Sequence, residues 1–364
     1  MFDWIPISQY TDIYHHILLF FTLMIFFHTQ TYDLQDYKGL NGLKIIGFIV
    51  LVFVILYMGG RPISYRFGDM GTYNRWFLYF EGGGDVTRAS HDILFNKFIQ
   101  YCSQIMTNKA FFFVCALLYI IPTYFVSKKW FKEYWVYAFI MLIGSFSFWA
   151  YGTNGIRNGL GTSFFLMGLS REKKIFQALW FFLAINFHGS LIIPVIAYVI
   201  ALFYKKPKYF FYFWLLCIPL SLFMGGFFTN FFAGFVDQSR SEYLTGGIGN
   251  DDEFSKSGFR WDFLLYSAAG VFAAWYYIFK KKINDKLYNH IVNTYLIANG
   301  FWILVINVNF SNRFAYLSWF LLALVIVYPW LKYSLVKEQN KQLGYLLLIY
   351  FGFTYLMNVI IYVQ

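Results

Sequence analysis

The chain has 364 residues, of which 59% are hydrophobic and 13% charged, and its formal net charge is +11. The apolar residues form blocks long enough to cross a hydrocarbon core of about 30 Å, which argues against a soluble fold. The basic residues form short clusters between these blocks, as the positive-inside rule predicts, so no nucleic-acid partner is expected.

Twelve apolar segments follow one another along the chain when the spanning length is used as a guide. They are residues 10–30, 44–60, 110–127, 134–151, 156–170, 175–187, 189–204, 209–235, 261–279, 287–307, 313–331 and 343–362. The predicted fold class is an all-α polytopic membrane protein with about 12 transmembrane segments, including short or re-entrant helices. We expect a single transmembrane domain over residues 1–364, with long outer loops at 61–109 and 236–260.

Lysine-rich loops give the expected orientation. They contain Lys128, Lys129 and Lys132; Lys173 and Lys174 with Arg171; Lys205, Lys206 and Lys208; Lys280, Lys281, Lys282 and Lys286; and Lys332, Lys337 and Lys341. Alternating twelve spans places all these loops on one side, which we expect to be the cytoplasm. Both termini are then predicted to lie outside.

Arginine shows the inverse pattern. The residues at or near the predicted outer face are Arg61, Arg66, Arg75, Arg88, Arg157, Arg240, Arg260 and Arg313. The positive-inside rule does not predict this distribution. Because the planar guanidinium binds phosphate and carboxylate groups bidentately, the outer side is predicted to bind anions.

The first outer loop contains GGRPISYRFGDMGTYNRWF, which places Arg61, Arg66, Asp69 and Tyr73 at the outer face. Asp69 has two interpretations. It forms an ion pair with Arg66, or it positions a substrate and acts as a general base toward a sugar hydroxyl.

Arg157 is predicted to lie below the outer surface, because the roughly 14 residues between it and Arg171 rise only about 21 Å. The preceding YGTNGIRN places Thr153 or Asn154 as a cap of the next helix, with Gly155 and Gly159 allowing close backbone approach. A helix N-terminus beside a guanidinium would bind phosphate. The alternatives are a structural ion pair and a small-residue helix contact.

His188 is predicted to lie at a similar depth. Inner clusters flank it on both sides at less than a full span, so the chain must turn at Asn186–Ser190. Non-helical backbone at that depth lines a cavity or is buried in protein, so we expect an outward-open cavity with Arg157 and His188 near its floor. The alternative is a turn histidine whose hydrogen bonds are satisfied by Asn186 and Ser190.

The second half contributes fewer candidates. The loop DQSRSEYLTGGIGNDDEFSKSGFR, between Arg240 and Arg260, is a lid or a solvated loop, and its acidic cluster is weak evidence for a divalent cation. Arg313 lies on the wall of the predicted cavity or anchors its helix at the interface.

The run from Asp69 to Pro194 resembles the EpsG-type, Wzy-like polysaccharide polymerases of bacterial envelopes. Four elements match in order: Asp69 and Tyr73 as Asp-x-x-x-Tyr; SHDILFNKFIQ at Ser90–Gln100; FSFWAYGTNGIRNGLGTSFFLMGL at Phe146–Leu169, with Arg157 at the family's arginine; and INFHGSLIIPVI at Ile185–Ile196, with His188, Ser190 and Pro194 matching. Asn158 stands where glutamine is usual, which is a departure from the family's pattern.

The resemblance implies a glycosyltransferase related to the GT-C fold, at the outer face of the bacterial cytoplasmic membrane. It would polymerise oligosaccharide repeat units carried on undecaprenyl diphosphate, in exopolysaccharide or O-antigen and lipopolysaccharide synthesis. Its partners would be the lipid-linked donor and acceptor, the bilayer and a chain-length regulator in the membrane. No metal or cofactor is expected, because arginine supplies the positive charge.

These expectations assign roles to ten residues. His188 is the candidate base and Asp69 the alternative; Arg157 holds the donor diphosphate; Arg313, Arg61 and Arg66 hold the second lipid diphosphate or the sugars; and Tyr73, Asn158, Arg240 and Arg260 complete the predicted substrate-binding set. Two rival functions keep the same charged cavity. One is a flippase for lipid-linked oligosaccharide, which the lack of a two-half repeat disfavours. The other is an O-antigen ligase-type glycosyltransferase that moves the glycan to another acceptor.

Overall fold

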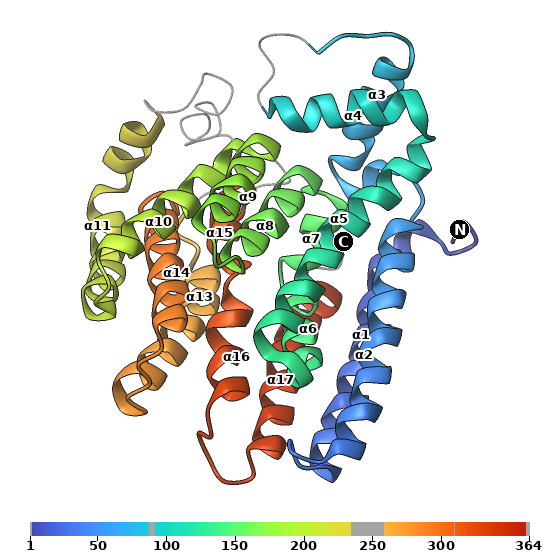
Figure 1. Cartoon of the computed structure of the whole chain (residues 1–364). Helices are drawn as coiled ribbons and strands as arrows, with labels where there is room; N and C mark the ends of the chain where they lie inside the picture. The colour runs from blue at the N-terminus through green and yellow to red at the C-terminus, as the bar shows by residue number, and fades with distance from the viewer. Residues whose placement is uncertain (1, 87–91, 234–257, 309, 362–364) are drawn as a thin grey trace. The chain divides into compact units, whose positions relative to one another are not determined.

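The computed structural model describes residues 2–86, 92–233, 258–308 and 310–361, and all regular secondary structure in these residues is helical (Figure 1). The chain forms two compact units. Unit 1 comprises Met1–Ile192 and Trp330–Gln364, and unit 2 comprises Ile193–Pro329. Each unit is described by itself. The expectation of a single transmembrane domain stays a prediction.

The helices of unit 1 are α1 (Ile7–Thr31), α2 (Tyr37–Gly59), η1 (Tyr65–Phe67), α3 (Met70–Glu81), α4 (Ile93–Ile105), α5 (Asn108–Phe131), η2 (Lys132–Tyr134), α6 (Trp135–Ile143), α7 (Phe148–Thr153), α8 (Ile156–Leu169), α9 (Lys174–Phe187), η3 (Gly189–Leu191), α17 (Gln339–Tyr355) and η5 (Leu356–Ile361). Those of unit 2 are α11 (Pro207–Ala233), α13 (Trp261–Trp275), η4 (Tyr276–Lys280), α14 (Lys286–Leu304) and α15 (Ser311–Trp319). The chain passes between the units within α10 (Ile192–Phe203) and α16 (Leu322–Lys332).

Each expected apolar segment coincides with one or more of these helices, so the all-helical, polytopic membrane character is confirmed. In the described part of the chain, seven helical stretches are long and apolar enough to cross a membrane: Ile7–Thr31, Tyr37–Gly59, Asn108–Ile143, Pro207–Phe232, Trp261–Lys280, Ser311–Lys332 and Gln339–Ile361. Two shorter apolar helices, Lys174–Phe187 and Gly189–Phe203, belong to the region where short helices were expected. The count of 12 spans and the GT-C-like architecture stay predictions.

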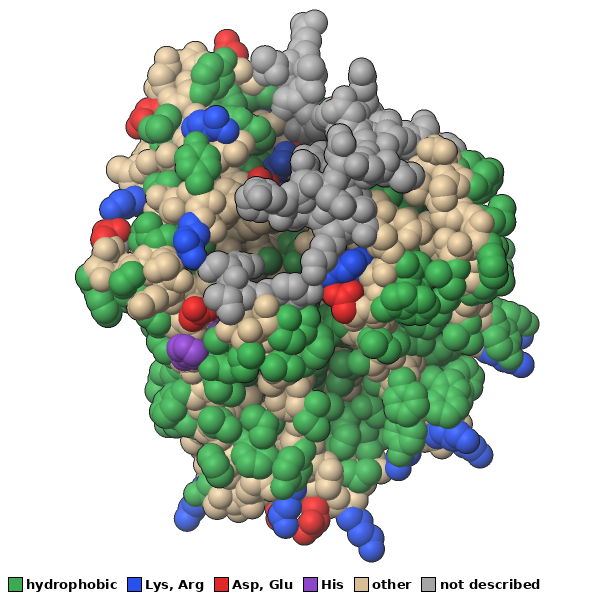
Figure 2. Space-filling view, turned by 180° about the vertical axis from the view of Figure 1, so that it is seen from behind, with side chains coloured by type: hydrophobic (Ala, Val, Ile, Leu, Met, Phe, Trp, Pro, Cys, Tyr) green, Lys and Arg blue, Asp and Glu red, His purple; other side chains and the backbone are tan. Residues whose placement is uncertain are grey.

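Large apolar side chains cover much of the surface, as helices in lipid require. Phe27, Ile45 and Ile349 of unit 1 are 63%, 64% and 72% exposed. Figure 2 shows hydrophobic side chains over much of the described surface. Exposing so much apolar area to water is energetically unfavourable, which supports a membrane environment.

Lys44 and Arg61 lie toward opposite ends of unit 1. At the lysine end, Lys44 at the start of α2 pairs with Glu133 beyond the end of α5. At the other end, Gly59 at the end of α2 lies against Phe113 near the start of α5, and Arg61 follows. We call the second end the arginine end, although Lys109 also lies there, paired with Asp3.

Small residues bring the two short helices of the site together. A Cβ atom on Gly159 would lie 2.6 Å from the Tyr151 carbonyl oxygen, and one on Gly161 would lie 3.1 Å from the Ala184 carbonyl oxygen. Helix α8 therefore packs closely on both α7 and α9. Because α8 and α9 are joined by a short connection, the start of α8 lies near the end of α9, and Arg157 comes close to His188.

Unit 2 is held by a buried polar cluster around Asn299. Its side chain accepts a hydrogen bond from Trp214 Nε1 at 2.7 Å and donates to Ser267 Oγ at 3.0 Å and Ser318 Oγ at 2.9 Å. Hydrogen bonds of this kind join transmembrane helices, each contributing about 0.6 kcal/mol on average. They connect α11, α13, α14 and α15.

Candidate active site

Arg157 lies in the first turn of α8 and is surrounded by groups from α3 and from the start of α4. Its Nη1 donates to Asp92 Oδ2 at 2.8 Å, and its Nε donates to the Tyr73 hydroxyl at 3.3 Å. The guanidinium carbon lies 5.6 Å and 5.5 Å from the ring centroids of Tyr73 and Trp76. These two residues are three apart on α3 and so share one helix face. The structure thus brings Tyr73 to Arg157.

His188 follows the last residue of α9, at the predicted turn. Its Nδ1 lies 3.4 Å from Asp92 Oδ2, and the next backbone amide, Gly189 N, donates to Asp92 Oδ1 at 2.7 Å. Asn186 instead donates to the Phe182 carbonyl oxygen of its own helix. The histidine is therefore held by a carboxylate from a distant segment, and Asn186 does not satisfy it.

Asp92 joins the two predicted residues, and the sequence analysis did not identify it. Its carboxylate contacts Arg157, His188 and the Gly189 amide, and its side chain is only 1% exposed. One signal pointed to it. A buried arginine in a membrane protein requires an anionic partner, and Asp92 is the acidic residue immediately before the amphipathic segment that forms α4.

Arg157, His188 and Asp92, here called the Arg157 group, are largely buried, but two of them remain partly exposed to solvent. The side chain of Arg157 is 25% exposed and that of His188 is 19% exposed. Burial raises the pKa of the Asp92 carboxyl, but the hydrogen bond and charge of His188, the charge of Arg157 and the Gly189 amide outweigh it and hold the pKa below its usual range. Asp92 is therefore ionised at neutral pH. The outward-open cavity around these residues stays a prediction.

The depressed pKa of Asp92 predicts how stability depends on pH. A carboxyl whose pKa is lower in the folded than in the unfolded state stabilises the fold above its unfolded pKa of about 4. This contribution is lost as the pH falls through the folded pKa. We expect wild type to exceed Asp92→Asn in thermal stability at pH 7, with the gap narrowing below about pH 4. Thermal unfolding of both proteins in detergent measures the gap, and a constant gap at all pH values contradicts the assignment.

Asp69 lies next to the site through its backbone. Its amide N donates to Asn154 Oδ1 at 2.9 Å, so Asn154 turns toward this segment. The capping prediction was wrong, because Gly155 is the N-cap of α8 with no side-chain cap and Thr153 donates to the Trp149 carbonyl oxygen. Gly68 is required here, since its φ is +60° and a Cβ would lie 2.3 Å from Asn154 Oδ1. The role of Asp69 as a base stays a prediction.

Two other predicted residues of unit 1 are buried away from the Arg157 group. Arg61 is 4% exposed, donates to the Met58 carbonyl oxygen and lies 6.0 Å and 5.8 Å from the Phe67 and Phe112 ring centroids. Burial lowers its pKa to about 10, so it stays charged at neutral pH. Asn158 is 8% exposed, and in the described residues its Oδ1 has no hydrogen-bond partner. Both side chains are thus largely shielded from solvent in this conformation.

Three of the remaining predicted residues have described contacts of their own. Arg66 is exposed on η1 and its backbone amide donates to Ser64 Oγ. In unit 2, Arg260 forms two hydrogen bonds with Asp262, at 2.9 Å and 2.6 Å, and the Arg313 guanidinium lies 5.0 Å from the Phe310 ring centroid. Arg240, the acidic cluster and most of loop 236–260 lie outside the described residues. Their roles stay predictions.

Metal-ligating groups are not clustered in the described part of the chain, where no three His, Cys, Asp or Glu side chains come together to hold a metal ion. The cysteines Cys102, Cys115 and Cys217 are buried free thiols.

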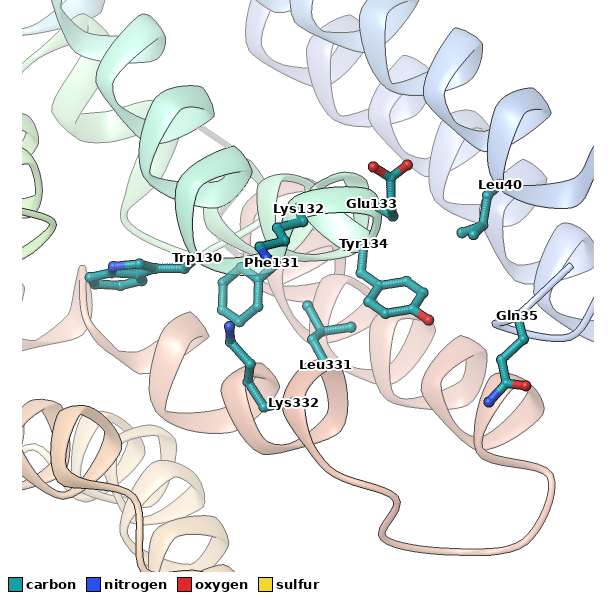
Figure 3. Close-up of a pocket in the computed structure, with 9 residues that line it drawn as sticks. All are labelled: Gln35, Leu40, Trp130, Phe131, Lys132, Glu133, Tyr134, Leu331 and Lys332. Carbon is teal, nitrogen blue, oxygen red and sulfur yellow. The ribbon is translucent and has the colours of Figure 1, made fainter. Parts of the chain in front are cut away.

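A separate hollow of about 480 Å³ lies at the lysine end of unit 1. It is lined by Gln35, Leu40, Trp130, Phe131, Lys132, Glu133, Tyr134, Leu331 and Lys332 (Figure 3). The Lys332 ammonium lies 5.8 Å from the Phe131 ring centroid. None of the predicted site residues lines this hollow, so it is distinct from the Arg157 group.

Comparison with known proteins gives one match. A family model described as the EpsG family matches residues 44–364, which is most of the chain. No curated protein and no solved structure matches the chain.

Proposed function

The chain belongs to the EpsG family, a family of Wzy-like polysaccharide polymerases, and we propose that it polymerises oligosaccharide repeat units carried on undecaprenyl diphosphate. The observation that carries the proposal is the grouping of Arg157, His188 and Asp92, which places a cation for a diphosphate beside a proton acceptor. A transmembrane fold of the GT-C type would provide the frame.

The distribution of charge in unit 1 supports a site that faces the outer side of the membrane. Arg157 contacts α3, and Arg61 lies near the start of α5, whereas Lys44 and Lys332 lie at the opposite end. Lysine-rich ends face the cytoplasm under the positive-inside rule. The Arg157 group would then face the outer side of the bacterial cytoplasmic membrane.

Arg157 would bind the diphosphate of the donor. In the described part of the chain, its Nη2 has no hydrogen-bond partner, and the side chain is partly exposed. Helix α8 also begins one residue before Arg157 without a side-chain cap, so the positive end of its dipole lies beside the guanidinium. A planar guanidinium and amide donors together suit phosphate oxygens.

The reaction is a displacement at the anomeric carbon of the donor sugar. The acceptor hydroxyl oxygen forms a bond to that carbon while the bond to the diphosphate oxygen breaks. The hydroxyl proton passes to His188, with Asp69 as the alternative base. The leaving lipid diphosphate carries the growing negative charge, which Arg157 stabilises. Because arginine supplies this charge, the proposal needs no metal ion.

Incubation of the purified protein with a lipid-linked repeat unit alone tests this function. A polymerase yields a ladder of products with increasing numbers of repeat units. A flippase yields no new product, and a ligase yields product only when a different acceptor is added. Either of the last two results contradicts the proposal.

A further inference from the structure

We infer that Asp92 is a positioning residue for proton transfer: it holds the Nδ1–H of His188, so that Nε2 is the ring nitrogen that takes the acceptor's proton. The inference rests on the proposed function and adds a residue to its mechanism. Asp92 itself need not touch the substrate.

The geometry fixes the ring through two atoms of one carboxylate. Oδ2 lies 3.4 Å from His188 Nδ1, and Oδ1 accepts from the adjacent Gly189 amide at 2.7 Å. An ionised carboxylate only accepts hydrogen bonds, so Nδ1 must carry the proton in this contact. In a neutral imidazole the other nitrogen, Nε2, then has the free lone pair. The contact is long for a hydrogen bond, as catalytic contacts often are before substrate binds.

The backbone of Asp92 shows that this orientation is imposed by the surroundings. An aspartate at a helix N-cap ordinarily accepts from the first amides of its own helix. Asp36 does so at the start of α2, accepting from the Lys38 and Gly39 amides. Asp92 occupies the same position before α4 but makes no cap hydrogen bond, and its φ of 59° and ψ of 46° are left-handed. Strain of this kind persists where other contacts enforce it.

The charges around His188 make the carboxylate necessary. Asp92 faces the ring from the start of α4, and Arg157 approaches the same carboxylate oxygen from α8. The hydroxyl of Tyr73, on α3, accepts a hydrogen bond from Nε of the Arg157 guanidinium. Arg157 shares this carboxylate with His188, so without Asp92 its positive charge would oppose the imidazolium that forms when the ring takes a proton. When a diphosphate binds to Arg157, the Asp92 carboxylate keeps its contact with His188.

The tautomer of His188 tests the inference without any assay of activity. The nitrogen shifts of ¹⁵N-histidine-labelled protein in bilayers report which ring nitrogen is protonated, and His188→Gln identifies the signal. We expect protonated Nδ1 in wild type and in Asp36→Asn, the matched N-cap control. In Asp92→Asn we expect the new side-chain oxygen to accept from the Gly189 amide, as Asp92 does. The side-chain NH₂ group then donates to His188 Nδ1, so the imidazole proton moves to Nε2. An unchanged tautomer in Asp92→Asn overturns the inference.

Kinetics separate positioning from folding and from binding. We expect Asp92→Asn to lower kcat for chain extension about 100-fold without raising KM, because Asp92 no longer competes with the diphosphate for Arg157. The acid limb of the rate profile should move to lower pH, and Asp92→Glu should restore part of the rate. A normal kcat, or a loss confined to KM, contradicts the inference. If wild type makes no ladder, the proposed function fails, and the tautomer still decides the role of Asp92.

Discussion

Cells whose only copy of this protein carries Arg157→Ala should make no long glycan. Arg157 is the partly exposed cation of the site and the group proposed to stabilise the departing diphosphate. Removing a single preorganised donor of this kind lowers a rate by about 10²–10³-fold, which is enough to eliminate long chains. Gel profiles of surface polysaccharide measure the effect, together with the amount of variant in the membrane fraction.

Two further variants separate chemistry from folding. Arg157→Ala leaves the Asp92 carboxylate buried without its cation, and breaking a buried pair destabilises a protein by about 3–5 kcal/mol. Arg157→Lys keeps the positive charge beside Asp92 but loses the planar fork, so we expect stable protein with strongly reduced chain extension. Arg75→Ala removes an exposed arginine of α3 that donates to the Thr72 hydroxyl and lies 5.8 Å from the Tyr65 ring centroid, and we expect normal polymer. Full activity of Arg157→Ala contradicts the assignment.

His188→Gln is expected to stop chain extension in a protein that still folds. Glutamine can donate a hydrogen bond to Asp92 as the imidazole does, but it cannot take a proton at pH 7. A base contributes about 10²–10⁴-fold to a rate, so the purified variant should show a loss of that size with little change in thermal stability. Timed incubation with a lipid-linked repeat unit measures the rate.

The control for this prediction is His16→Gln. His16 is exposed on α1, and its ring forms a hydrogen bond with the Tyr355 hydroxyl. Neither residue belongs to the Arg157 group. We expect that variant to extend chains normally. If His188→Gln polymerises near the normal rate, His188 is a scaffold, and Asp69→Asn becomes the decisive variant for the base.

The helices and the two ends of unit 1 followed from the sequence. Apolar length predicts where helices lie, since each expected segment coincides with a helix. Within unit 1, Lys44 and Arg61 lie toward opposite ends, whereas Arg171 lies among lysines and Lys109 lies at the arginine end. The turn at His188 was predicted correctly from the short distances between lysine clusters, because helix rise per residue is fixed.

Contacts between distant segments could not be predicted in this way. Asp92 reaches His188 because its backbone is left-handed and α4 packs on α9. Neither property produces a periodic pattern of residues in the sequence. Asn154 was expected to cap α8 but binds the Asp69 amide, a choice that depends on where the segment after α2 folds. Arg61 was predicted at the outer face as part of the substrate-binding set, yet it is buried, with aromatic rings from α5 and η1 beside its guanidinium.

The most direct test counts two products in one incubation of purified protein with a lipid-linked repeat unit. The proposed displacement releases one free lipid diphosphate for every new glycosidic bond. We therefore predict a ratio of released lipid diphosphate to new bonds of about one throughout the ladder. With Arg157→Lys, we predict only a small remaining amount of either product. New bonds without released lipid diphosphate, or a wild-type rate in Arg157→Lys, would contradict the account.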